Sequence, residues 1–376
     1  MQRATWMTRL PWSIVALCVA LMLLGWLGIA RSEALSVTAG RYVHRQLLWS
    51  LLCIVAMLLA TIPSYRILAR WSYAAFFGSL VLLVAVYGFP PVNGAQRWIR
   101  FGPVGLQPSE FAKLAFVLGL ARYLMYRDSY RRLSGLLVPL ALVMVPLLLI
   151  LKEPDLGTAL VFLPVLFVML FAAGVRRRHL ALLVVMALAV LPLLWSQMSR
   201  EQKSRITALA EQTRADEKPT DDGYHLHQAK QMLALGGWTG SLAGGQTTAD
   251  LGVYFVPEPH TDSIAVVLGE RLGLVGWGLL LGLFLLLTWR GLAVAQATRE
   301  PYGRLVAIGI AALLATQVLI NTGMLVGLLP ITGLSLPLVS YGGSSLLANC
   351  LALGLLLNIG LRPGYEVTNE PFRFAS

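Results

Sequence analysis

The sequence predicts an all-α polytopic membrane protein with about ten transmembrane helices and one large extracytoplasmic loop between the seventh and the eighth. Hydrophobic residues occupy 57% of the 376 positions, charged residues only 13%, and the mean hydropathy is +0.70. Soluble domains carry about 25% charged residues. A chain this long and this apolar is therefore typical of a protein that crosses a membrane many times.

Ten segments are candidates for membrane spans, since a spanning helix needs about 20 mostly apolar residues. They lie near 12–30, 46–62, 71–89, 110–125, 134–151, 158–175, 179–195, 263–288, 304–326 and 341–361. The first run is longer than the apolar region of a cleaved signal peptide, which is about 7–15 residues. We therefore expect it to remain as the first span.

Ten spans place both chain ends on one side of the membrane, and the basic residues select that side. Arginines gather in the loops that share the side of the N-terminus, so the positive-inside rule places both termini in the cytoplasm. Arg31, Arg41 and Arg45, in the first outer loop, run against this bias. The net charge of +12 also suits nucleic-acid binding. We expect no nucleic-acid partner, because the basic residues stand in short clusters between apolar runs.

Residues 1–376 form one predicted membrane domain, with a large extracytoplasmic loop at 196–262. The loop starts with the charged SREQKSRITALAEQTRADEKPTDDG, at whose beginning we expect a surface helix. It continues through the amphipathic YHLHQAKQMLAL and the glycine-rich GGWTGSLAGG. Its composition favours a folded loop over simple disorder. His225 and His227 flank one residue, which is too weak a pattern to predict a metal site.

The three cysteines, Cys18, Cys53 and Cys350, all fall in apolar segments. They form neither a metal-ligand spacing nor a disulfide framework. We predict that they pack in the core.

A polar cluster precedes the fourth span in NGAQRWIRFGPVGLQPSEFAKL. Arg97 and Arg100 are candidate phosphate ligands, because a guanidinium matches phosphate oxygens in geometry. Trp98 suits the interfacial aromatic belt. Lys113 follows Glu110 by three residues, so the two can pair on one helical face. An anchoring salt bridge and a charged wall of a substrate cavity both remain open for this pair.

Two further predicted outer connections contain candidate binding residues. In LKEPDLGTAL, Lys152 and Asp155 either belong to a polar cap on a tight helix connection or help to hold a divalent cation on a pyrophosphate. In PLVSYGGSSLLAN, Ser344 and the glycines before it either present N–H groups to an anion or allow close helix packing.

The segment VPEPHTDSIAVVLGE places His260 and Asp262 directly before the eighth span. A Thr261 or Asp262 side chain that caps this helix is one interpretation. The other is a carboxylate in a partly desolvated cavity, whose raised pKa suits a general base. His260 is a competing base or an interfacial hydrogen-bonding residue.

Taken together, these motifs resemble the SEDS family (shape, elongation, division and sporulation). They are GAQRW, QPSEFAKL, EPDLGTA, GGWTG, PEPHTD followed by GE-x-LG, and PLVSYGGSS, in matching order and spacing. The resemblance implies a ten-helix fold in the bacterial cytoplasmic membrane. It implies a peptidoglycan glycosyltransferase that polymerises lipid II at the outer face, for elongation or division. It also implies a class B penicillin-binding protein as partner, and membrane lipids around the chain.

The resemblance assigns Asp262 to the family's essential aspartate, and Trp98, Glu110 and Lys113 to positions that matter for activity. The predicted catalytic residue is thus Asp262, and no metal ligand is predicted, although a divalent cation, Mg²⁺ or Mn²⁺, remains open as a cofactor. The predicted substrate-binding residues are Arg97, Trp98, Arg100, Glu110, Lys113, Lys152, Asp155, His260 and Ser344.

Three positions depart from the family pattern. Ser263 replaces a phenylalanine, Arg271 replaces an acidic residue, and Gly105 stands where a basic residue is frequent. Two other functions fit a polytopic chain with outer charges: a lipid II flippase, and a scaffold that only recruits a transpeptidase. A flippase predicts matching polar groups near the membrane midplane and on the inner side, and few are found.

Overall fold

The structure, a computed structural model, describes residues 10–35, 41–91, 95–102, 104–126, 133–198, 200–211, 222–244 and 258–364. The described regular structure is helical apart from one antiparallel hairpin, β1 (Ile99–Phe101) and β2 (Val104–Leu106). Arg127, Arg131 and Arg132, which belong to one of the predicted cytoplasmic loops, lie outside the described residues, as do parts of the large loop.

Each of the ten predicted spans overlaps a helix. These are α2 (Trp12–Leu35), α3 (Arg41–Leu59), α4 (Tyr65–Ala85), α5 (Pro108–Tyr126), α6 (Leu137–Lys152), α7 (Leu156–Ala172), α8 (Arg177–Gln197), α12 (Ile264–Ala297), α13 (Pro301–Leu325) and α14 (Gly343–Leu361). Short 3₁₀ turns, η1 (Val86–Gly88) and η3 (Leu133–Leu136), adjoin α4 and α6. The prediction of an all-helical polytopic membrane protein is confirmed.

Seven of the helices in the described ranges are both long and apolar enough to cross a membrane. The helix α5 carries three charged residues, and α7 is shorter, at 17 residues. Both nonetheless pack inside the bundle, so tertiary contacts supply what their own composition lacks. The three cysteines are free and buried, as predicted.

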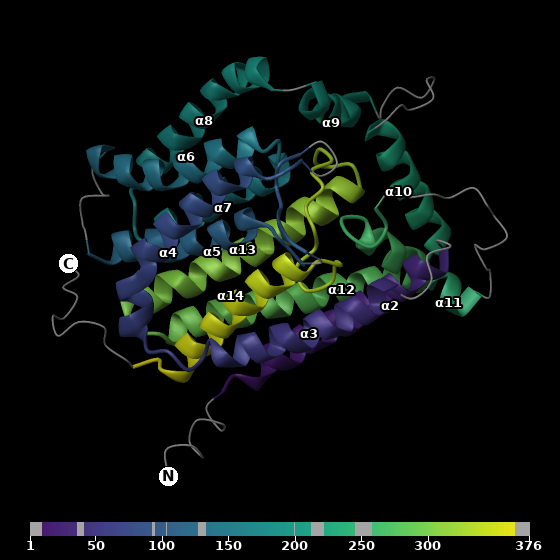
Figure 1. Cartoon of the computed structure of the whole chain (residues 1–376), viewed down its shortest axis with the longest axis horizontal. Helices are drawn as coiled ribbons and strands as arrows, with labels where there is room; N and C mark the ends of the chain where they lie inside the picture. The colour runs from purple at the N-terminus through teal and green to yellow at the C-terminus, as the bar shows by residue number, and fades with distance from the viewer. Residues whose placement is uncertain are drawn as a thin grey trace, which may run out of the picture.

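Among the helices long and apolar enough to cross a membrane, α13 and α14 are the most buried, and they lie in the centre of the bundle (Figure 1). In each of these two helices, 78% of the most apolar stretch is buried, against 22% in α3. Gln46, near the start of α3, donates to the carbonyl of Ser340, just before α14. Tyr87, just after α4, donates to the carbonyl of Leu149, near the end of α6. These contacts place the start of α3 beside the start of α14, and the end of α4 beside the end of α6, as expected if the spans alternate in direction.

The helix α12 is broken at Gly273, whose φ of 68° lies in the left-handed region that favours glycine. Trp277 after the break donates to the carbonyl of Ala265 before it, at 2.6 Å. A continuous helix would separate these two residues by about 18 Å. The two halves of α12 therefore lie side by side.

The two halves of α12 also run in opposite directions along α2. In the first half, Ile264 packs on Gly28, and Glu270 pairs with Arg31 at 2.9 Å. In the second half, Arg290 donates to Ser13 at the start of α2. The predicted eighth span at 263–288 is thus corrected: the crossing segment follows Gly273 and continues to Ala297. Asp262 directly precedes the first half. It therefore lies partway along α2, farther from the end of α2 than Glu270 does.

The large loop is folded over this break. It contains α9 (Arg200–Glu211), α10 (Asp222–Gly236) and α11 (Gly240–Gly244), which lie toward one end of the bundle (Figure 1). The surface helix expected in the charged stretch is α9. Leu274 donates its N–H to the carbonyl of Gly237, and a Cβ on Gly240 would meet the carbonyl of Arg271 at 2.3 Å. The GGWTG motif therefore clamps the broken helix.

Candidate active site

Asp262 lies in the turn of residues 258–263, which we call the Asp262 turn, directly before α12. Its side chain is buried, at 8% exposure. Burial, and to a lesser degree the neighbouring charge of Glu258, raise the pKa of Asp262 to about 7. Hydrogen bonds from its own backbone N–H and from Ser263, and the charge of Arg205, act in the opposite direction. A carboxyl group with this pKa can accept a proton near neutral pH.

The capping interpretation of the Asp262 turn is wrong. The N-cap of α12 is Ser263, and it makes no side-chain cap hydrogen bond. The Thr261 hydroxyl instead donates to the Glu258 carbonyl inside the turn. The Asp262 carboxylate is thus left to receive a proton rather than to hold the helix start.

The Asp262 turn is attached to the loop of residues 326–342, between α13 and α14. Asn321 on α13 donates to the carbonyl of Asp262 at 2.8 Å and to that of Leu334 at 2.7 Å. Ser340 donates to the carbonyl of Thr261, and Tyr341 donates its N–H to that of His260. Buried backbone carbonyls need such partners. Asp262 is therefore fixed from two sides.

One turn before Asn321 on the same helix, Gln317 contacts the predicted charged pair. The Lys113 ammonium donates to Glu110 at 2.9 Å and to Gln317 at 3.0 Å. Glu110 and Lys113 are 4% and 2% exposed, so the predicted pair forms, but inside the bundle rather than at an interface. Residues four apart lie on one helical face. The pair and the Asp262 turn are thus connected to neighbouring positions of α13.

Ser344, in the first turn of α14, joins that helix to the hairpin. Its hydroxyl donates to the carbonyl of Gly105 at 2.9 Å and accepts from the N–H of Gln107 at 3.2 Å. Trp98 packs over Gly105, where an added Cβ would meet the indole at 3.0 Å. The departure to glycine at this position therefore makes room for the indole. Arg100 is exposed on β1.

The EPDLGTA motif forms the α6–α7 connection. Arg97 donates to the backbone carbonyls of Glu153 and Pro154, so part of its guanidinium fixes this bend. Asp155 is the N-cap of α7, where it accepts from the N–H and hydroxyl of Thr158, and it also accepts from Gln107. The exposed Lys152 lies over the ring of Tyr87.

The α6–α7 connection lies beside the Asp262 turn. A Cβ on Gly157 would meet the carbonyl of Thr332 at 2.8 Å. The next residue, Gly333, lies close to Asp262: its added Cβ would be 3.8 Å from Oδ2. The start of α7 and Asp262 thus contact adjacent residues of the 326–342 loop.

His260 is held between aromatic rings rather than beside Asp262. It stacks on Tyr42 at 4.3 Å and meets Tyr341 edge-on at 5.7 Å. Burial lowers its pKa, while the charges of Glu258 and Glu33 raise it. The contacts suit a residue that ties the Asp262 turn to α3.

Several residues that contact the predicted site residues were not themselves predicted as site residues. Asn321 and Gln317 hold the Asp262 turn and Lys113, and His225 on α10 reaches the Ser263 hydroxyl at 2.8 Å. The available signal was the occurrence of amide side chains inside an apolar span, which are costly there unless they bind a partner. Glu153 gave no such signal, although its carboxyl is fully buried and both oxygens lack a hydrogen-bond partner.

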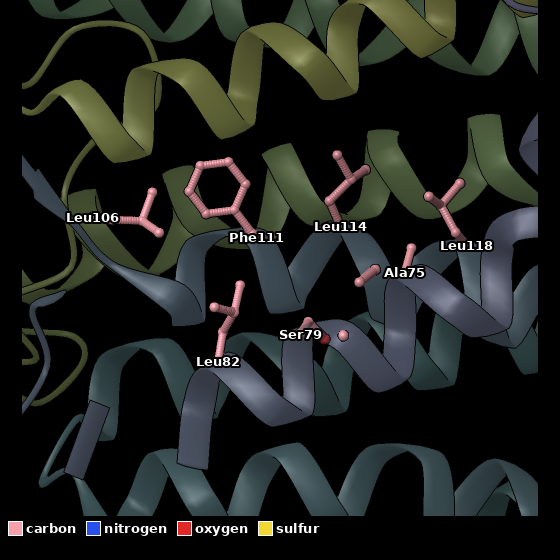
Figure 2. A pocket seen from close by; sticks show the side chains of 9 residues that line it. Ala75, Ser79, Leu82, Leu106, Phe111, Leu114 and Leu118 are labelled. Carbon is pink, nitrogen blue, oxygen red and sulfur yellow. The ribbon is translucent and has the colours of Figure 1, made fainter. Parts of the chain in front are cut away.

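An apolar cavity of about 340 Å³ lies next to the hairpin, between α4 and α5 (Figure 2). Leu106, Phe111, Leu114 and Leu118 line one wall, and Ala75, Ser79 and Leu82 of α4 line the other. The Ser79 hydroxyl donates to the Phe76 carbonyl, so it is already bonded. This cavity suits an apolar chain.

The fold and this buried polar site define an all-helical, multi-pass membrane protein whose site lies at one end of the bundle. A family model described as cell cycle protein, for FtsW, RodA and SpoVE, matches residues 8–362. The chain therefore belongs to the SEDS family, and its RodA-like fold is that of a protein of the bacterial cytoplasmic membrane.

Curated relatives and solved structures agree with this assignment. A probable peptidoglycan glycosyltransferase FtsW of Trichlorobacter lovleyi is 37% identical over 85% of this chain and 83% of its own length. The peptidoglycan glycosyltransferase MrdB of Escherichia coli is 38% identical, covering 81% and 82%.

Among solved structures, a chain from a peptidoglycan synthase complex that coordinates polymerization and crosslinking superposes with a TM-score of 0.80. It is 32% identical, over 94% of this chain and 98% of that one. The rod shape determining protein RodA of Thermus thermophilus gives 0.69, at 30% identity, over 95% and 98%.

Proposed function

We propose that this peptidoglycan glycosyltransferase, with a role in division or elongation, polymerises lipid II, and that Asp262 is its general base. The single observation that carries the assignment of the base is the burial of the Asp262 carboxyl group, which raises its pKa to about 7. General bases work best when their pKa lies near the operating pH. Asn321 and the 326–342 loop fix its backbone, as a positioned base requires.

The reaction is a displacement at an anomeric carbon. Asp262 takes the proton from the C4 hydroxyl of the acceptor N-acetylglucosamine, and that oxygen attacks C1 of the donor N-acetylmuramic acid. The bond from C1 to the pyrophosphate breaks, and undecaprenyl pyrophosphate leaves. An α-linked sugar thereby becomes a β-1,4 link, with inversion.

Cations at this end of the bundle suit the leaving group. Arg100 and Lys152 are exposed, and both lie in segments that contact the site through Ser344 or Asp155. Positive charge near a pyrophosphate stabilises the charge that develops as the bond breaks. Glu110 and Lys113 supply a buried charged wall.

The apolar cavity beside the hairpin supports a place for the lipid tail (Figure 2). Its wall includes Leu106, which precedes Gln107, the residue bonded to both Ser344 and Asp155. A tail held there would leave the pyrophosphate near the hairpin, and this would orient the donor.

A divalent cation does not find a ready set of protein ligands. Among the described residues, no group of three or more histidine, cysteine, aspartate or glutamate side chains lies together. Both oxygens of Asp155 already accept hydrogen bonds. We derive no step through Mg²⁺ or Mn²⁺, which would instead arrive on the substrate's phosphates and need few protein oxygens.

The proposal includes an orientation and a partner. With both termini in the cytoplasm, Asp262 and the loop helices face outside, where lipid II is consumed. The synthase complex to which this chain is similar supports a class B penicillin-binding protein as the partner that crosslinks the new strands.

One assay tests this function against its two rivals. The purified chain, with and without the transpeptidase, is given labelled lipid II and scored for glycan strands, and liposomes score lipid II crossing. We expect strands from the wild type and none from Asp262→Ala. Strand formation by Asp262→Ala at the normal rate would refute the general base. Crossing without strands would identify a flippase, and neither activity would identify a scaffold.

A further inference from the structure

The carboxylate of Asp262 is connected to the large loop through a chain of side chains. The Ser263 hydroxyl lies 3.4 Å from Asp262 Oδ1 and 2.8 Å from His225 Nε2. Ser263 is fully buried, Asp262 nearly so, and His225 is partly exposed on α10. The chain thus leads from a buried carboxyl group to an imidazole that water can reach.

We propose that Ser263 and His225 form a proton relay that returns Asp262 to its ionised state after each sugar transfer. The inference rests on the proposed function, in which Asp262 becomes protonated once per bond formed. A buried carboxylic acid needs a route for that proton before the next turnover.

The relay balances without any further reactant. The Asp262 carboxyl gives its proton to Ser263 Oγ, while the Ser263 hydroxyl proton passes to His225 Nε2. The imidazolium then releases a proton to water, and imidazole exchanges protons with water readily near neutral pH. The serine keeps one proton throughout, so it acts only as a bridge.

The geometry fits both protonation states of the base. With Asp262 ionised, Ser263 donates to the carboxylate, and His225 Nε2–H donates to Ser263. With Asp262 protonated, both hydrogen bonds reverse after His225 exchanges protons with water and takes the Nδ1–H tautomer, which leaves Nε2 as the acceptor. The link of 3.4 Å is longer than a typical O–H···O bond. Catalytic hydrogen bonds of unliganded enzymes are frequently long and shorten when substrate binds.

The charged and titratable groups around Asp262 come from separate elements. Glu258 belongs to the same turn and Arg205 to α9, while His225 acts through Ser263 from α10. The helix α10 packs closely on α12, because a Cβ on Gly236 would meet the Gly269 carbonyl at 2.1 Å. This packing holds His225 next to Ser263, at the start of α12.

The relay is a feature of this chain rather than of the family pattern. The family's usual residue after the HTD motif is phenylalanine, which has no hydroxyl. Ser263 therefore makes a contact that the pattern does not provide for.

The test measures kcat and KM for lipid II with the full chain and its transpeptidase. His225→Ala and Ser263→Ala are expected to lower kcat by about tenfold to a hundredfold, at or below the lower end of the range for a direct proton-transfer group, with KM unchanged. Millimolar imidazole should restore His225→Ala but not Ser263→Ala, which lacks the bridge. His227→Gln is the matched control, because His227 contacts Gln231 on the exposed side of α10.

The outcomes separate the relay from the proposed function. Normal kcat in His225→Ala, no rescue by imidazole, or an equal loss in His227→Gln overturns the relay. If Asp262→Ala is inactive while His225→Ala is normal, only the relay fails. If Asp262→Ala keeps full activity, the general base itself is wrong. Since His225 lies partly exposed on a loop helix, its variants test the relay even if Ser263→Ala does not fold.

Discussion

Asn321 holds Asp262 by its backbone and not by its carboxylate. The Asn321 amide donates to the Asp262 carbonyl and, with its second hydrogen, to the Leu334 carbonyl. One fully buried side chain thus fixes the Asp262 turn against the 326–342 loop while the carboxylate stays available. The catalytic geometry therefore depends on a helix, α13, that supplies no reacting group itself.

Removing this anchor should impair catalysis more than lipid II binding. Asn321→Ala leaves two buried carbonyls without the Asn321 donor. A catalytic base that shifts by about 1 Å can lower the reaction rate about 100-fold. We expect a kcat lower by roughly tenfold to 100-fold with KM changed little. Thr322→Ala, one residue on, is the control, because its hydroxyl only contacts Val318 in its own helix. Equal kcat values for the two variants would contradict the anchoring role.

The rate should rise with pH through about 7. Asp262 must be ionised to accept a proton, and its pKa is raised to about 7, so kcat/KM climbs across that value. Removing the Glu258 charge lowers this pKa, so Glu258→Gln should move the rise to lower pH. Arg205→Gln removes a charge that lowers it and should move the rise to higher pH. Shifts in the same direction, read from pH–rate profiles, would count against Asp262 as the base.

The buried pair of Glu110 and Lys113 should show strong coupling in stability. Lys113→Met leaves a buried carboxylate without its cation, which costs about 3–5 kcal/mol. The double variant Glu110→Gln with Lys113→Met removes both charges and should regain most of that stability without regaining polymerisation. Thermal unfolding in detergent and the lipid II assay measure the two effects. A double variant as unstable as Lys113→Met would show that the pair is not coupled.

Glu153 should make the fold less stable as pH rises. Its pKa is raised to about 8, chiefly by burial and also by the charge of Asp155, whereas an unfolded glutamate ionises near 4.5. The folded state therefore binds the extra proton, and stability is lost as pH rises from about 4.5 to about 8.

Glu153→Gln should remove this pH dependence, so its melting temperature at pH 8 should exceed that of the wild type. At pH 4 the difference should be small, because the carboxyl group is then protonated in both states. Parallel melting curves for the two proteins from pH 4 to pH 9 would contradict the buried carboxyl.

The break in α12 should require glycine at 273. Gly273→Ala places a Cβ at 2.5 Å from the Trp238 carbonyl, on a backbone with φ of 68°. We expect a lower melting temperature and impaired polymerisation, because the GGWTG clamp positions the first half of α12. Gly278→Ala, five residues later in open space, should be neutral or stabilising. A Gly273→Ala protein as stable as this control would show that the clamp is dispensable.

The sequence by itself determined the helical spans, because a membrane helix must satisfy its backbone within one apolar segment. It also determined that Asp262, Glu110 and Lys113 are unusual, because charge near lipid is costly. Only the tertiary structure decided how these residues meet. The reversal at Gly273 depends on backbone contacts with residues 237–240, and the contacts of Asn321 and His225 span 59 and 38 positions. Such relationships have no local signature, since they arise only when distant segments pack together.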